Sequence, residues 1–145
     1  MRDVLLSVRP RFVDLILAGK KTVELRRKIW NLKKDVDWAY VYASAPVQKV
    51  VAIFHPNPIY CSNIGGLWEM FGDPRRNVLG VSEDEFYRYF EGLRVGYALQ
   101  ITHLCKAKYP VPVCNIGKPP QNFRYLQEWE KDAITQFIKQ MEASP

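Results

Sequence analysis

The stretch Gly19-Lys-Lys-Thr-Val-Glu-Leu-Arg26 decides how the surrounding chain folds and where its chemistry lies. Glycine adopts left-handed backbone angles at little cost, so Gly19 is suited to end a helix and to turn the chain sharply. After this turn apolar and polar residues alternate, and a period of two predicts a half-buried strand. The polar face of that strand carries Thr22, Glu24 and Arg26.

This polar face is compatible with three kinds of role. Glu24 and Arg26 are two residues apart, which places them on one face at a spacing of roughly 7 Å. Arg26 is a bidentate donor for a phosphate or a base edge, and Glu24 is an acceptor for an amino group. Acid–base catalysis by Lys21 or Glu24 is the second role. The third is a solvated ladder of salt bridges, which contributes little. Lys20 and Lys21 lie in the turn, so the alternation does not determine where they point.

Short elements surround this stretch. A helix is expected from Pro10, which suits a first helical turn, to Gly19. Strands are predicted over residues 4–8, 22–27, 38–44, 49–54 and 96–104. The sequence His55-Pro-Asn-Pro58 should end the strand at 49–54, because proline cannot donate to a ladder. Residues 109–114 also carry prolines and form at best an edge strand.

The second half of the chain adds helices. A short helix is expected between Gly65 and Gly72, and the capping-box spacing of Ser82 and Glu85 predicts another that ends at Gly92. A final helix should begin near residue 127. Its apolar stripe is expected to consist of Trp129, Ala133, Phe137 and Met141. Short strands with inserted helices predict one α+β domain over residues 1–145, with a small, closed, antiparallel-rich sheet.

The positive charge is concentrated at one end of the chain. The formal net charge is +6, and residues 1–34 hold ten Lys and Arg against three Asp and Glu. The remaining residues hold eleven basic and twelve acidic side chains. A local basic field attracts polyanions, of which nucleic acid is the commonest, although basic residues also simply solvate a surface.

Composition excludes several classes of protein. No apolar run is long enough to cross a bilayer, and charge interrupts the N-terminal apolar residues too early for a secretory signal. Cys61, Cys105 and Cys114 have no metal-ligand or disulfide spacing, so reduced thiols in a cytoplasmic protein are expected. Neither a metal nor a cofactor is predicted.

Further side chains are candidates for ligand contacts. Trp30 and Trp68 lie in turn-rich surroundings and are suited to stack on an unpaired base. Ser44 at a strand end is a possible donor, although a turn role is the alternative. Arg75 and Arg76 follow Gly-Asp-Pro in an exposed loop and could contact phosphates at a rim or remain solvated.

The pattern Gly19-x-Lys21-x-x-Glu24-x-Arg26 resembles the signature of the ASCH domain family. The Val-Tyr-Ala-Ser-Ala-Pro run at 41–46, the Ser82 helix and Pro119-Pro-Gln-x-Phe123 follow it in the order that the family shows. The resemblance implies a PUA-like β-barrel with flanking helices beside a cleft. It also implies that the cleft binds RNA or another nucleic acid, with the signature along one wall.

Some relatives in this family are enzymes. One subgroup hydrolyses N4-acetylcytidine with a lysine, a threonine and a glutamate, and others are ribonucleases. Lys21 matches that subgroup's lysine, but Glu24 stands where its threonine would be. The distal glutamate should fall near Leu79, where this chain has no carboxylate. The amidohydrolase triad is therefore incomplete in this sequence.

These observations predict an RNA-binding protein, or one that binds another single-stranded nucleic acid. The anion field is assigned to Lys20, Lys21, Arg26 and Arg27. A metal-independent hydrolase of RNA or of a modified nucleoside is the alternative, with Lys21, Glu24 and Arg26 as catalytic residues. A third hypothesis is that the protein is a sensor that binds a nucleotide-like small molecule. A monomer or weak homodimer without membrane contact is expected.

Overall fold

The computed structural model describes residues 2–112 and 115–143, with side chains as far as residue 136. One mixed six-stranded sheet has the order β2-β5-β4-β3-β1-β6. The strands are β1 (Arg2–Val8), β2 (Val23–Arg26), β3 (Val36–Ala43), β4 (Lys49–Asn63), β5 (Val95–Pro112) and β6 (Phe123–Tyr125). The helices are α1 (Pro10–Leu17), α2 (Ile64–Phe71), α3 (Glu83–Tyr89) and α4 (Glu128–Ala143).

The sheet is rich in antiparallel pairs, as expected, but it is not closed. Only β1 and β3 pair in parallel, and the other neighbouring strands are antiparallel. Strands β2 and β6 are the two ends of the sheet. The expected closure of the sheet is therefore wrong at the level of backbone pairing between the strands that the structure describes.

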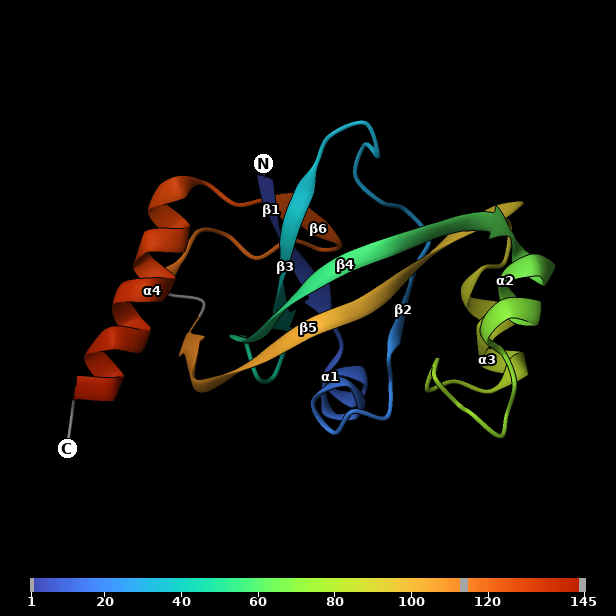
Figure 1. Ribbon diagram of the computed structural model, residues 1–145, viewed down its shortest axis with the longest axis horizontal. Coiled ribbons are helices and arrows are strands. Elements are labelled where there is room, and N and C mark those ends of the chain that lie inside the picture. Colours follow the sequence, from blue (N-terminus) through green and yellow to red (C-terminus); the bar gives the residue numbers. More distant parts are fainter. Residues whose placement is uncertain (1, 113–114, 144–145) are drawn as a thin grey trace.

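The long ribbon of β4 and β5 joins the two ends of the molecule (Figure 1). Helix α4 lies near one end of this ribbon, and α2 and α3 lie at the other. The prediction that prolines end the strand at residue 54 was wrong, because β4 continues to Asn63. Register shifts between Ile53 and His55 and between Pro56 and Ile59 accommodate the positions at which proline cannot donate to the ladder. Strand β5 likewise runs on to Pro112.

Three apolar clusters form the core. Two of them involve the β1–β3–β4 region of the sheet, and the third joins β2 and β5 to α2 and α3. Val23 and Leu25 face this third cluster, where they contact buried side chains such as Phe86. Strand β2 is thus anchored by its apolar face, as its alternation predicts. The opposite face is also buried, so the strand is not half-exposed.

The local helix signals are confirmed. Pro10 occupies the first turn of α1, and Gly19 follows that helix with a φ of +75°. Ser82 and Glu85 form the complete capping box of α3. The amide of Lys21 donates to the carbonyl of Leu15 at 3.1 Å, so the end of α1 also positions the first residue of the polar stretch.

The start of α4 buries a different face from the expected stripe. Trp129 is 53% exposed, whereas Glu130 and Ile134 are buried. Trp129 is therefore not a core residue of α4, because a neighbouring helical position faces the sheet instead. The side chains of Phe137 and Met141 lie outside those described. In the part of the chain that the structure describes, no helix is long and apolar enough to span a membrane.

Candidate functional site

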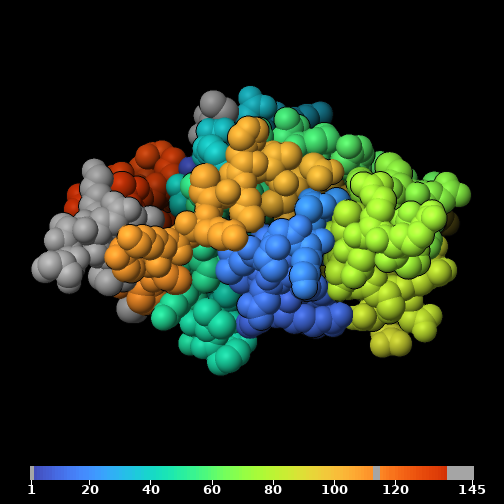
Figure 2. All heavy atoms as spheres, turned by 60° about the horizontal axis from the view of Figure 1, so that its bottom comes forward, coloured from blue at the N-terminus to red at the C-terminus, as the bar shows by residue number. Residues whose placement is uncertain are grey.

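A cleft of about 770 Å³ lies over the polar face of β2. Its walls come from the end of β1, the start of α1, helix α3 and the segment before β6. Figure 2 shows the blue N-terminal quarter of the chain beside the yellow-green segment that carries α3. The cleft therefore collects residues far apart in the sequence. Lys21, Glu24 and Arg26 line it together.

Lys21 is held at the floor of this cleft and is only 3% exposed. Its Nζ donates to the carbonyl of Val23 at 2.8 Å and to that of Leu79 at 2.6 Å. It also lies 5.2 Å from the centre of the Phe12 ring. Burial lowers the pKa of Lys21 below its usual 10.5, and the nearby cations Arg26 and Arg11 lower it further, although Glu24 opposes these effects.

Glu24 is a buried carboxylate without a partner. Its side chain is on the polar face of β2, and the residue is 5% exposed. Among the described residues its carboxylate makes no hydrogen bond or ion pair, and its Oε2 is fully buried and unsatisfied. Burying an unpaired acceptor is costly, so such a group in a cleft is a candidate for binding a ligand's donor.

Arg26 connects opposite ends of the sheet. Its Nη1 donates to the carbonyl of Ser7 on β1 at 3.0 Å. Its Nη2 donates to the carbonyl of Asn122, just before β6, at 3.1 Å and also to the side-chain oxygen of Asn122. Its Nε is buried and has no partner. Bidentate donation from Arg26 to a phosphate stays a prediction, and it would require the terminal nitrogens to leave these protein acceptors.

Basic side chains surround the mouth of the cleft, but they differ in availability. Arg11 pairs with Glu85 at 2.8 Å, and Arg27 donates to the carbonyls of Tyr89 and Glu91 at 2.6 and 3.0 Å. The unpaired rim cations are Arg9, Lys28 and Arg88. All three are exposed, and none of their charged side-chain groups has a partner among the described residues. The free positive charge at the mouth thus belongs to these three.

Most of the other predicted residues lie away from the cleft. Ser44 is an exception, because it lines the cleft. Thr22 is half-buried and Lys20 is exposed, and neither lines it. The prediction that Trp30 stacks on a base was wrong, because it is 4% exposed and packs edge-on against Phe123 in the core. Arg75 and Arg76 are exposed and away from the cleft, and Arg75 pairs with Asp73 at 3.3 Å.

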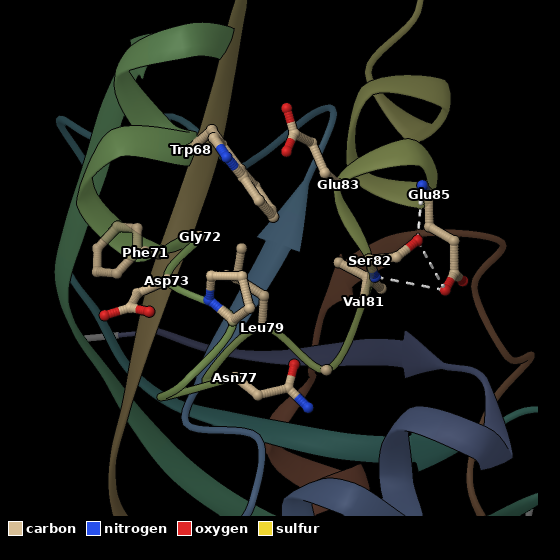
Figure 3. Close-up of a pocket in the computed structure, with 12 residues that line it drawn as sticks. Trp68, Phe71, Gly72, Asp73, Asn77, Leu79, Val81, Ser82, Glu83 and Glu85 are labelled. Atoms are coloured by element: carbon tan, nitrogen blue, oxygen red, sulfur yellow. Dashed lines mark hydrogen bonds between the residues drawn. The ribbon is translucent and has the colours of Figure 1, made fainter.

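Trp68 lines a different pocket, of about 420 Å³, between α2 and α3. Figure 3 shows its indole ring opposite Glu83, with Leu79 below. The ring packs against Phe86 at a centroid distance of 5.1 Å and covers Gly72. Trp68 is therefore not a stacking platform in the cleft around Lys21. Its packing instead fixes α2 on α3.

Sequence reasoning missed several residues of the cleft. They are Ser7, Arg9, Arg11, Lys28, Glu85, Arg88, Gln121 and Asn122. The concentration of basic residues before position 35 was a signal for Arg9, Arg11 and Lys28. No local pattern marks Asn122 or Arg88, because only the fold brings them to β2. Cys61 and Cys105 are exposed free thiols away from the cleft, and Cys114 lies outside the described residues.

Comparisons with known proteins give a consistent result. No family model matches the chain. An ASCH domain-containing ribonuclease from Zymomonas mobilis is 28% identical over 150 residues, which cover 97% of this chain and 95% of the relative. The crystal structure of ASCH from Zymomonas mobilis has a TM-score of 0.81 at 26% identity, with 92% and 94% of the two chains covered.

A crystal structure of a ZmASCH mutant from the same organism gives the same fold. Its TM-score is 0.82 at 24% identity, and it covers 94% of this chain and 98% of its own. These likenesses confirm the α+β class and are compatible with a PUA-like architecture, even though strand pairing leaves the sheet open. They extend over nearly the whole of each chain.

Proposed function

This chain is an ASCH domain, and from that premise we propose that it binds RNA in the cleft over β2. The observation that carries the proposal is the combination of a floor with an unpaired carboxylate and a mouth with unpaired cations. Lys21, Glu24 and Arg26 form the floor, and Arg9 and Arg88 are among the rim cations. A flexible polyanion with polar bases matches both parts.

The charge distribution supports this proposal. Seven basic side chains line the cleft against two carboxylates, and one of those carboxylates, Glu85, is already paired with Arg11. A solvated salt-bridge ladder, by contrast, would place Glu24 and Arg26 in water with each other as partners. The name of the Zymomonas mobilis relative, a ribonuclease, is consistent with an RNA ligand.

The proposal predicts salt-dependent binding of single-stranded RNA, measured by filter binding across a series of salt concentrations. Each phosphate contact contributes about 0.7 to the slope of log affinity against log salt for a single strand. We therefore expect Arg9→Ala and Arg88→Ala each to reduce that slope by about 0.7 and to weaken binding at low salt.

Arg75→Ala with Arg76→Ala is the matched control, because these arginines are exposed and lie away from the cleft. The control should leave the slope within error of the original protein. Absence of affinity for any RNA at low salt would overturn the proposed function. An equal loss of slope and affinity in the control would show that positive charge anywhere on the surface contributes to RNA binding, so that the cleft has no special role.

Metal-independent RNA hydrolysis is a second candidate, favoured by the environment of Lys21. Burial lowers the pKa of Lys21 and so increases its neutral fraction. The two hydrogen bonds from Nζ engage both hydrogens of a neutral amine and leave its lone pair to accept a proton. In strand cleavage, Lys21 would take the 2′-hydroxyl proton, and the 2′-oxygen would attack the adjacent phosphorus. The bond between phosphorus and the 5′-oxygen would then break, the 5′-oxygen would take a proton from water, and a 2′,3′-cyclic phosphate would remain.

Hydrolysis is tested by incubating the protein with end-labelled single-stranded RNA in the presence of a chelator. The hydrolase reading predicts shorter products with 2′,3′-cyclic phosphate ends, and Lys21→Met should abolish them. The same RNA with a 2′-methoxy group at each position should remain intact. If the RNA binds but is not cleaved, the hydrolase hypothesis is rejected and the RNA-binding hypothesis stands.

A further inference from the structure

We propose that the floor of the cleft receives the edge of an unpaired nucleobase, while the phosphates of the strand remain at the rim. This inference rests on the proposed RNA binding and states the direction in which the strand enters. It is carried by the hydrogen-bonding groups that the protein leaves unused at the floor. The other orientation, with a phosphate at the floor, uses groups that are already engaged.

The guanidinium of Arg26 is not available as a phosphate clamp. Its two terminal nitrogens are bound to Ser7 and Asn122, and these contacts link β2 to β1 and to the start of β6. A bidentate grip on a phosphate needs two parallel donors from one guanidinium. Three of the five N–H groups donate to these partners, both hydrogens of Nη2 among them, and the buried Nε, which has no partner, can donate to one acceptor on a ligand.

Lys21 has little more to offer an anion. Two of the three donors of its ammonium group already bind the carbonyls of Val23 and Leu79. The aromatic ring of Phe12 covers another side of the group. At most one N–H donor of Lys21 therefore remains for a ligand, whereas phosphate-binding lysines usually present several donors.

The carboxylate of Glu24 determines which part of the RNA strand can face the floor of the cleft. Its carboxylate is buried, lines the cleft and accepts no hydrogen bond from the part of the chain that the structure describes. A phosphate beside it would meet a like charge away from water, which is strongly unfavourable. A neutral ligand with an N–H group would instead fill the vacant acceptor.

A nucleobase edge has the required pair of groups. Each base carries an N–H donor beside an oxygen or nitrogen acceptor, and these can meet Glu24 and the Nε of Arg26. A cavity of about 770 Å³ has the size of a small-ligand site, so it suits one nucleotide taken out of a stack. The strand's phosphates then face the unpaired cations Arg9, Lys28 and Arg88.

The first test compares RNA heptamers with an abasic ribose-phosphate heptamer of the same charge. Oligocytidylate, oligoadenylate and oligouridylate are titrated against the unmodified protein at one salt concentration. We expect at least one of the three to bind tenfold or more tightly than the abasic chain. Equal affinity for the abasic chain and all three RNAs would overturn base insertion while leaving RNA binding intact.

The second test uses the sign of a charge change. Glu24→Gln removes the negative charge and replaces one acceptor oxygen by a donor, so it should weaken the base-bearing heptamer by about tenfold and tighten the abasic one. A phosphate at the floor predicts tighter binding of both. Glu69→Gln is the control, because it makes the same charge change at an exposed position outside the cleft.

The outcomes separate the two levels of the proposal. If the unmodified protein binds none of the oligomers, the proposed function fails and the inference fails with it. If RNA binds but Glu24→Gln tightens base-bearing and abasic chains alike, only the inference fails. Thermal unfolding checks that Glu24→Gln is folded, and if it is not, the abasic comparison on the unmodified protein decides alone.

Discussion

Replacing Arg26 with alanine is expected to lower the free energy of unfolding by about 3 kcal/mol, since buried charged hydrogen bonds contribute most when one partner is removed. The guanidinium joins β2, at one end of the sheet, to Ser7 and Asn122, which lie near the other end. Alanine would leave these partly buried acceptors without their donor. The change should be visible as a loss of roughly 10 °C in Tm.

Thermal and denaturant unfolding measure this effect directly. Arg88→Ala is the matched control, because Arg88 lines the same cleft but is exposed and has no partner in the part of the chain that is described. It should change stability by less than about 0.5 kcal/mol. Arg26→Lys should recover little, because an ammonium group cannot span two backbone segments. Equal stability of Arg26→Ala and the original protein would show that the link across the sheet is not required.

Replacing Lys21 with methionine is expected to change how stability depends on pH. Burial lowers the pKa of Lys21 in the folded protein, whereas the unfolded chain keeps a value near 10.5. Between these two values the unfolded chain binds more protons, so the free energy of unfolding rises with pH. The advantage of the original protein over Lys21→Met should therefore grow as pH rises toward 10.5, by at most about 1.4 kcal/mol per pH unit.

Denaturant unfolding at a series of pH values provides the measurement, and taking the difference between the two proteins cancels the other titrating groups. Lys20→Met is the control, because Lys20 is adjacent in sequence but exposed. A pH-dependent difference as large for Lys20→Met as for Lys21→Met would show that the effect does not come from burial at the floor of the cleft. A flat difference for Lys21→Met would mean that Lys21 is equally easy to protonate in the folded and unfolded chains.

Much of the local structure followed from short-range physics in the sequence. The proline at the start of α1, the glycine after it and the capping box of α3 each act within a few residues, and all three were correctly predicted. The alternation in β2 correctly placed Val23 and Leu25 against the core. The strand lengths were less accurate, because pairing across the β4–β5 ribbon carried β4 past its prolines and extended β5 from residue 104 to Pro112.

The aromatic side chains show a different limit. Trp30 and Trp68 occupy turn-rich sequence, which favours neither a core nor a surface position. Packing against Phe123 placed Trp30 in the core, and packing against Phe86 placed Trp68 between two helices. These partners are distant in sequence, so no window around either tryptophan contains the information.

The polar stretch from Gly19 to Arg26 carries both kinds of information. Its sequence determined a turn, a strand and a face with Glu24 and Arg26, because backbone angles and side-chain alternation are local properties. Only the tertiary structure decided that this face is buried. It also decided that the guanidinium of Arg26 donates to Ser7 and Asn122, and that the carboxylate of Glu24 has no hydrogen-bond partner among the described residues. The physical reason is that burial and hydrogen-bond saturation depend on which distant segments close over the strand.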